Sequence, residues 1–234
     1  MPLTDEDLFY AQRGDPTATR LVFADSLPQC GRIAYSLTGL KSSGRNALKK
    51  LVSKSKQQFD TWRDAGEVRR WFLHQAILQT RDYRTPHGVD EDVLMEGVGG
   101  PDAVQYRALI AGLRKLSPQQ QEAFLLIHAE GMDVRQTAVA MDCSNSAVQI
   151  HFEQACNALS PLAGKHFKPL VDYLTRIHRG QQIELPATPE RLAARIRTGR
   201  TLRLIGRVLA WTILLGFIAV VAYAAYDIYP RIKT

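Results

Sequence analysis

The chain has 234 residues, with 30 Lys or Arg against 23 Asp or Glu, which gives a net charge of +7 at neutral pH. That length suits two small domains and an anchor. A basic chain ordinarily indicates a nucleic-acid partner, but much of this excess lies in one C-terminal stretch, so the net charge is weak evidence for DNA binding. The stretch contains Arg191, Arg195, Arg197, Arg200, Arg203 and Arg207.

The chemistry-bearing residue types do not form a catalytic or metal-binding pattern. No Gly-rich phosphate loop, HExxH motif or Ser-His-Asp order is present. Cys30, Cys143 and Cys156 are well separated and lack a His partner at ligand spacing, which favours buried, reduced thiols in a cytosolic domain. The sequence therefore predicts a protein that is not an enzyme and that holds no metal or cofactor.

Four helices are predicted in residues 1–86, which we interpret as one small helical domain. Thr4 can cap the first helix with Asp7 three residues on, and Asp15-Pro16 begins the second. The third is expected over 45–62 and the fourth over 68–84, where Thr85-Pro86 stops it. The next stretch, 87–104, is acidic and glycine-rich and is predicted to be a linker.

Residues 105–165 have the pattern of a helix-turn-helix domain. Ser117 can cap a helix with Gln120, and Gly131 ends it. A short second helix and a turn at 142–144 follow. The last helix is expected to bury four residues spaced for one face: Val148, Phe152, Ala155 and Leu159. The alternative is an ordinary three-helix bundle. The residues predicted to face DNA are Ser144, Asn145, Ser146, Gln149, His151 and Gln154.

The C-terminal part, beyond a helical, Arg-rich stem at 166–207, contains an uncharged apolar run at 208–226. At about 1.5 Å per residue the run reaches across a hydrocarbon core of roughly 30 Å. It has no polar face, which favours a transmembrane helix over a buried core helix. Because arginines precede the run and only a short tail follows, the positive-inside rule predicts a single pass with the N-terminus in the cytoplasm.

The helix-turn-helix segment resembles region 4 of bacterial RNA polymerase sigma factors of the extracytoplasmic-function branch. The matching positions keep the family's spacing without a gap. They are Leu113, Leu116, Gln120, Phe124, Leu126, Glu130, Gly131, Gln136, Ala138, Ser144, Val148, Ala155 and Leu159. The family usually has an acid at Gln136 and arginines near His151, Gln154 and Asn157, whereas this last helix has no Lys or Arg. We therefore expect weak DNA binding, since cations supply most nonspecific affinity.

The first half resembles region 2 of the same family through two sets of residues. Ala11, Gly14 and Asp15 match its opening, and an aromatic set follows: Phe59, Trp62, Val68, Arg69, Trp71, Phe72 and Asp82. The resemblance implies that the helix carrying Arg70, His74 and Arg81 faces promoter DNA, with aromatic support for an unstacked base. The alternative for Trp62 and Trp71 is that they are core aromatics.

The family's polymerase-binding helix corresponds best to residues 47–54, which implies contacts from Leu48, Lys49, Leu51 and Val52. The family has acids there, while this chain has Lys49, Lys50 and Lys54. That reversal should weaken a charge-complementary interface.

These features predict an all-α protein with two small helical domains and one transmembrane helix. We interpret it as a sigma-like initiation factor that recruits RNA polymerase core to promoter DNA from the cytoplasmic membrane. An anti-sigma factor, or a protease that cuts the stem at 186–206, is a further expected partner. The alternative is a sigma-derived scaffold that binds a regulatory protein at the membrane without starting transcription.

Overall fold

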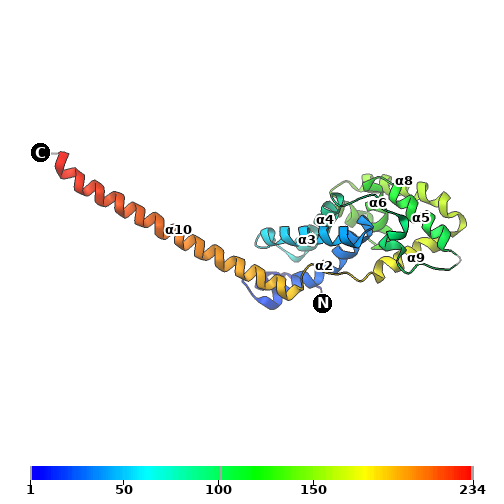
Figure 1. Cartoon of the computed structure of the whole chain (residues 1–234), viewed down its shortest axis with the longest axis horizontal. Helices are drawn as coiled ribbons and strands as arrows, with labels where there is room; N and C mark the ends of the chain where they lie inside the picture. Colours follow the sequence, from blue (N-terminus) through cyan, green and yellow to red (C-terminus); the bar gives the residue numbers. More distant parts are fainter. Residues whose placement is uncertain (1, 101, 233–234) are drawn as a thin grey trace.

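The computed structural model describes residues 2–100 and 102–232, with only the backbone described for 200, 203, 204, 207 and 223–232. Within those residues every regular element is a helix, as the sequence predicts. All but one of the long helices gather in a globular part, and α10 (Pro189–Ile232) projects from it as a single rod (Figure 1).

The N-terminal half consists of four helices whose starts are set by side-chain caps. They are α1 (Asp5–Gln12), α2 (Pro16–Thr38), α3 (Lys41–Gln58) and α4 (Ala65–Arg81). The predicted capping box of Thr4 and Asp7 and the Asp15 cap are confirmed. The third and fourth helices begin and end earlier than predicted. Asp64, which was not among the predicted caps, accepts from the Glu67 amide and starts α4.

The core of this half is aromatic and surrounds α2. The Phe23 ring lies 6.1 Å from those of Phe59 and Phe72. Trp62 is buried against them, so the core-aromatic interpretation holds for it, while Trp71 is half-buried at the edge. The Gln12 amide donates to the Phe59 and Trp62 carbonyls and ties α1 to the α3–α4 loop.

The second half begins after two short turns, η1 (Val89–Glu91) and η2 (Val93–Met95), and continues through seven further elements. They are α5 (Ala103–Lys115), α6 (Pro118–Phe124), the π-helical turn η3 (Leu125–Ala129), α7 (Val134–Met141), α8 (Asn145–Ala163), η4 (Gly164–His166) and α9 (Phe167–Gly180). The stretch predicted to be a linker is packed in part. Leu94 is buried, and the buried Asp92 carboxylate accepts from Arg114 Nε at 2.6 Å.

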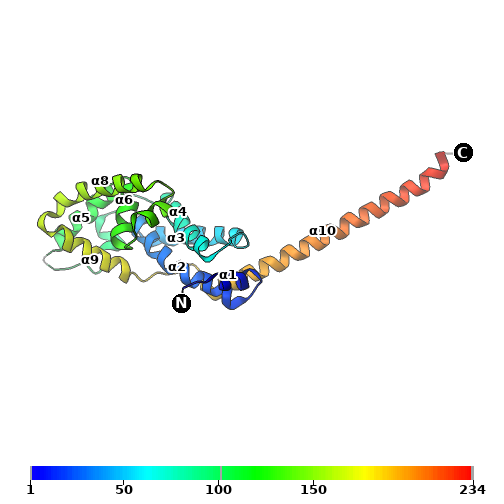
Figure 2. The same cartoon turned by 180° about the vertical axis from the view of Figure 1, so that it is seen from behind.

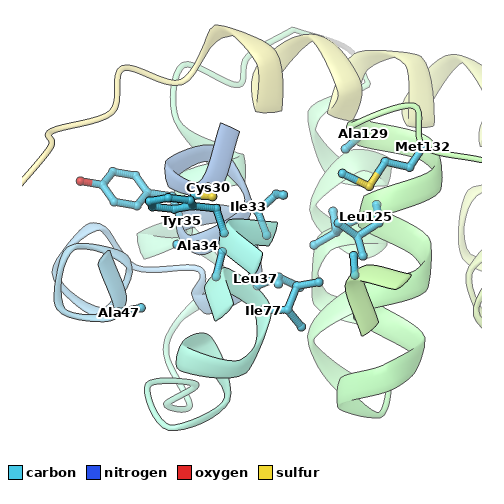
Figure 3. Close-up of a cluster of buried hydrophobic side chains, with 14 of the residues drawn as sticks. Cys30, Ile33, Ala34, Tyr35, Leu37, Ala47, Ile77, Leu125, Ala129 and Met132 are labelled. Carbon is cyan, nitrogen blue, oxygen red and sulfur yellow. The ribbon is translucent and has the colours of Figure 1, made fainter. Parts of the chain in front are cut away.

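The two halves share one hydrophobic core. Figure 3 shows Ile33 and Leu37 of α2 and Ile77 of α4 on one side, with Leu125 of η3 opposite them, all buried. A polar contact crosses the same boundary. The Glu122 carboxylate, fully buried, accepts from Arg81 at 2.8 and 3.0 Å and from Arg84 at 2.6 Å. The halves therefore pack as one body.

The C-terminal helix α10 starts in the core and leaves it. Leu192 and Ile196 are buried, and Arg20 of α2 pairs with Glu190 at 3.7 Å. Across the part of the chain that the structure describes, no helix is both long enough and apolar enough to cross a membrane. The predicted span at 208–226 extends over 223–226, whose side chains lie outside the described residues.

We predict that Glu122→Ala destabilises the whole globular part. The change leaves the Arg84 guanidinium, whose Nε and Nη1 are already buried without a partner, uncompensated. Removing one member of a buried ion pair typically costs about 3–5 kcal/mol. Urea unfolding of the full chain in mild detergent measures the change. Asp90→Ala, which breaks the exposed Arg107 pair, is the control and should cost less than about 1 kcal/mol. If both variants lost the same small amount of unfolding free energy, the role given to Glu122 would be contradicted.

Candidate nucleic-acid interface

The turn between α7 and α8 has the geometry of a helix-turn-helix. Asp133 and Gln136 form a capping box at the start of α7. Asp142 takes a left-handed conformation with φ of 56°, which Asp tolerates better than most residues, and this ends the helix. The Ser144 hydroxyl then accepts from the Ala147 amide and starts α8. The turn predicted at 142–144 is thereby confirmed.

The buried face of α8 is close to the prediction. Val148, Ala155 and Leu159 have no exposed surface. Phe152 differs, because it is half-buried and its ring lies 5.0 Å from that of His128 at the edge of the core. Three successive turns of α8 are therefore held against α5, α6 and α7, and the opposite side is left to solvent.

The outer face of α8 is polar. Ser144, Asn145, Ser146, Gln149 and Gln154 are exposed, as the sequence predicts. His151 departs from the prediction: it is half-buried, with Nδ1 enclosed and without a hydrogen-bond partner in the described structure. Two further exposed residues, Ile150 and Glu153, were not predicted. Their helical spacing could have identified them.

Cations are scarce around this face. Residues 106–159 contain four Lys or Arg against five Asp or Glu. Arg107 pairs with Asp90, and Arg114 pairs with Asp92. Arg135 in the first turn of α7 is exposed, and the described ion pairs do not include it. Amide and hydroxyl groups on α8 can meet base edges, but attraction to phosphates has to come mainly from neighbouring elements.

The side chains of α4 that the resemblance assigns to DNA lie at the boundary between the halves. Arg81 is held by Glu122 of α6, and His74 Nδ1 lies 3.2 Å from the Ala140 carbonyl of α7. Arg70 stays exposed, 3.8 Å from Asp64. Beside this contact, a cleft of about 640 Å³ opens between α4 and α7, lined by Arg69, Arg70, Leu73, Glu130, Asp133 and Arg135 among others. The α4 face can reach DNA only beside this cleft or after the halves separate.

The residues predicted to bind polymerase differ in how far they are buried. Leu48, Leu51 and Val52 lie in the core of the N-terminal half, whereas Lys49 is exposed. Of the four residues predicted to contact polymerase, three are therefore packed against other helices of the same half and only Lys49 is exposed. The polymerase contact of Lys49 stays a prediction. Lys50 on the same side binds Asp82 at 2.6 Å.

A buried polar cluster that was not predicted joins three segments distant in the chain. His178 Nε2 lies 2.7 Å from Glu130 Oε1, and His178 Nδ1 lies 2.7 Å from the Ser36 hydroxyl. Arg32 also donates to Glu130, at 3.1 Å. The order serine, histidine, carboxylate is that of hydrolases, but Ser36 is fully buried and cannot meet a substrate. Its members are too far apart in the chain for spacing to reveal them.

The cysteines correct one prediction. Cys30 is buried, and burial raises the pKa of its thiol, but Cys143 is exposed and Cys156 is half-buried. Cys143 stands in the turn before α8, where no packed face requires a buried residue.

Comparison with known families decides the nature of this segment. The family model for sigma-70, region 4 matches residues 106–159. Residues 106–159 form a sigma-70 region 4 domain. Neither a curated protein nor a solved structure matches the chain. The match covers residues 106–159 alone, and a region 4 domain suggests DNA binding of the kind that sigma factors perform.

We predict a shallow salt dependence for DNA binding by the region 4 domain. With few cations near α8, the slope of log affinity against log salt should be about 1–2 in magnitude, and Arg135→Ala should reduce it by about 1. Gln149→Ala should change the preferred sequence and leave the slope unchanged, since amides pair with adenine edges. Salt titrations with the full chain measure this, with the exposed Lys168 of α9 changed to Ala as control. A steep slope that Arg135→Ala leaves unaltered would contradict the assignment.

We also predict acid sensitivity at Asp92. Burial alone would raise the pKa of this carboxyl, but hydrogen bonds and charge from Arg114, with the Leu94 amide and His87, hold the pKa below its usual range. The stability that Asp92 confers is therefore present above the unfolded-state pKa of about 4 and is lost as the pH falls through the lower folded-state pKa. Asp92→Asn should lower the unfolding free energy at pH 7 and flatten its decline between about pH 5 and pH 3. If Asp92→Asn left the decline of the unfolding free energy in acid unchanged, as we expect for the exposed Asp102→Asn reference, this role would be refuted.

Proposed function

We propose that the protein is a membrane-tethered sigma-like factor whose region 4 domain binds promoter DNA and recruits RNA polymerase core. The observation that carries the proposal is the exposed α8 in a helix-turn-helix arrangement within the matched segment. Its first turn offers Ser144, Asn145 and Gln149, and the start of a recognition helix is the part that meets base edges in this motif.

The proposed anchor is the apolar run at 208–226. Exposed apolar side chains follow α10 from Val208 to Val221 without a covering element among the described residues. The full uncharged run of 19 residues at 208–226 has the length of a bilayer span and would be unfavourable in water. Arg191, Arg195 and Arg197 are exposed on the preceding turns, which supports a cytoplasmic position for the globular part at the inner membrane.

The packing of α10 against α2 limits where a protease could cut to release the globular part. Leu192 and Ile196 hold the start of α10 against α2. A cut at 181–188, between α9 and α10, would leave the globular part attached through these contacts. A releasing protease would therefore cut beyond Ile196, in the helical stem before Val208. The cleavage segment predicted at 186–206 is therefore restricted to its part beyond Ile196.

A second candidate function is a sigma-derived scaffold that binds a regulatory protein, such as an anti-sigma factor, at the membrane. Two observations favour it. The α8 face has no Lys or Arg and presents Ile150 and Glu153, and the α4 face meets α6 and α7. Lys49 and Lys54 stand where the sigma family has acids, and this also favours the scaffold function.

The first function predicts promoter-dependent activity. The full chain in detergent should co-elute with core polymerase and support transcripts from selected promoter DNA. Asn145→Ala with Gln149→Ala should reduce transcription at least tenfold, because two base contacts at about 1–3 kcal/mol each are lost. Asn157→Ala, an exposed amide farther along α8, is the matched control and should have little effect. Failure to bind polymerase would reject this function in favour of the scaffold.

A further inference from the structure

The helix α10 leaves the globular part at a defined end. It runs antiparallel to α2. The Tyr35 hydroxyl, late in α2, donates to the Glu184 carbonyl just before α10 at 3.4 Å, whereas Arg20, early in α2, pairs with Glu190. A cleft of about 390 Å³ at the start of α2 is lined by residues of both helices, including Thr17 and Arg197. The exit therefore lies beside the start of α2, the helix on which α1 also packs, and Figure 2 shows α1 and the first turns of α10 at the same end of the globular part.

Exposed aromatic side chains occur at this same end. Phe9 and Tyr10 of α1 are 47 % and 49 % exposed, with ring centroids 5.6 Å apart, and the Arg13 guanidinium lies 4.0 Å from the Phe9 ring centroid. The other Phe, Tyr and Trp side chains of the described residues before α10 are buried or half-buried. Aromatic rings beside a cation are the residue types that collect at membrane interfaces.

The charge around the exit is also suited to lipid. Arg20 and Arg197 line the cleft, and Arg13 adds a third cation. Glu190 is paired with Arg20, and the Asp15 carboxylate accepts from the Ala18 amide at the start of α2. Three arginines therefore stand against two carboxylates, Glu190 and Asp15, which leaves one net positive charge. Basic residues near a bilayer surface are attracted to anionic lipids by about 1 kcal/mol each.

The length of the stem brings this end close to the bilayer. From Arg197 to Val208 the helix rises about 16 Å. The head-group layer takes about 5–8 Å of that rise. A gap of about 10 Å therefore remains between this end of the globular part and the head groups. Extended arginine and aromatic side chains, together with an ordinary helix tilt of about 20°, can bridge it.

We propose that Phe9, Tyr10 and Arg13, together with Arg20 and Arg197, form a membrane-contact surface that rests on anionic lipid head groups. We call these five residues the exit face. The inference rests on the anchor in the proposed function. It adds that the globular part is oriented against the bilayer, with the region 4 domain turned toward the cytoplasm at the opposite end (Figure 1).

A label at Thr17, an exposed position outside the exit face, tests the contact. The full chain carries Cys143→Ser and Cys156→Ser, and the buried Cys30 stays. A fluorophore is attached at Thr17→Cys or, as control, at Val104→Cys, which is 76 % exposed and belongs to α5, a helix that Figure 1 shows at the end of the globular part away from α10. Its emission is read in vesicles whose head groups bear nitroxide quenchers. We expect at least twofold stronger quenching at Thr17 in anionic vesicles than at Val104. Equal quenching at both positions would overturn the inference.

A second variant isolates the exit face itself. Phe9→Ser with Tyr10→Ser and Arg13→Ser should bring quenching at Thr17 down to the Val104 level, since these side chains are exposed and their loss leaves the core intact. Unchanged quenching at Thr17 would overturn the role of these residues, and equal quenching in neutral and anionic vesicles would overturn the preference for anionic lipid.

Flotation of the same samples distinguishes this inference from the proposed function. If the full chain floats with vesicles while the Thr17 label is unquenched, the anchor stands and only the membrane-contact surface fails. If the chain does not float, the anchor fails, and the contact surface that rests on it fails too.

Discussion

The Glu122 carboxylate, enclosed between Arg81 and Arg84, is the interaction on which the arrangement of the two halves depends. It has no exposed surface, so its charge is stable only while both guanidinium groups are in place. Those groups belong to the end of α4 and the residues just after it, and Glu122 belongs to α6 of the region 4 domain. The contact therefore fixes α4 against α6 and, through His74 and the Ala140 carbonyl, against α7. The apolar contact of Leu125 with the α2–α4 core is buried by the same docking.

This docking has a direct consequence for how the molecule meets other molecules. The start of α8 points to solvent, while the α4 residues that resemble a second DNA-binding surface lie against α6, α7 or the cleft between them. In the docked arrangement the polar outer face of α8 is open to base edges, and this face has little positive charge of its own. Binding at α8 does not require the halves to separate, whereas use of Arg81 on DNA would require the Glu122 pair to break.

Much of this fold could be predicted from local sequence signals. Thr4, Asp15 and Ser117 mark helix starts because capping acts over three residues, and the α8 stripe of Val148, Ala155 and Leu159 follows from helical periodicity. The outer face of α8, apart from the half-buried His151, follows from the same periodicity. Asp64 was overlooked although its signal is of the same local kind.

The rest depends on contacts between residues distant in sequence, which spacing cannot reveal. Glu130, His178 and Ser36 come together only because α9 folds back onto α2. Leu48 and Leu51 are buried because α3 packs on α2 and α4. The family resemblance predicted polymerase contacts for these two residues, although they lie on the side of α3 that faces the core. The covering of α4 by the region 4 domain likewise arises from Glu122, whose partners lie about forty positions earlier in the chain.

The distance distribution between spin labels on the two halves tests the docked arrangement most directly. In the full chain with Cys143 and Cys156 replaced by Ser, one label at the exposed Arg63 before α4 and one at the exposed Gln149 of α8 report on both halves at once. Docking through Glu122 predicts a single narrow distribution in the wild-type background that broadens in Glu122→Ala. A distribution that is already broad with Glu122 in place would contradict the account, because the halves would then move independently.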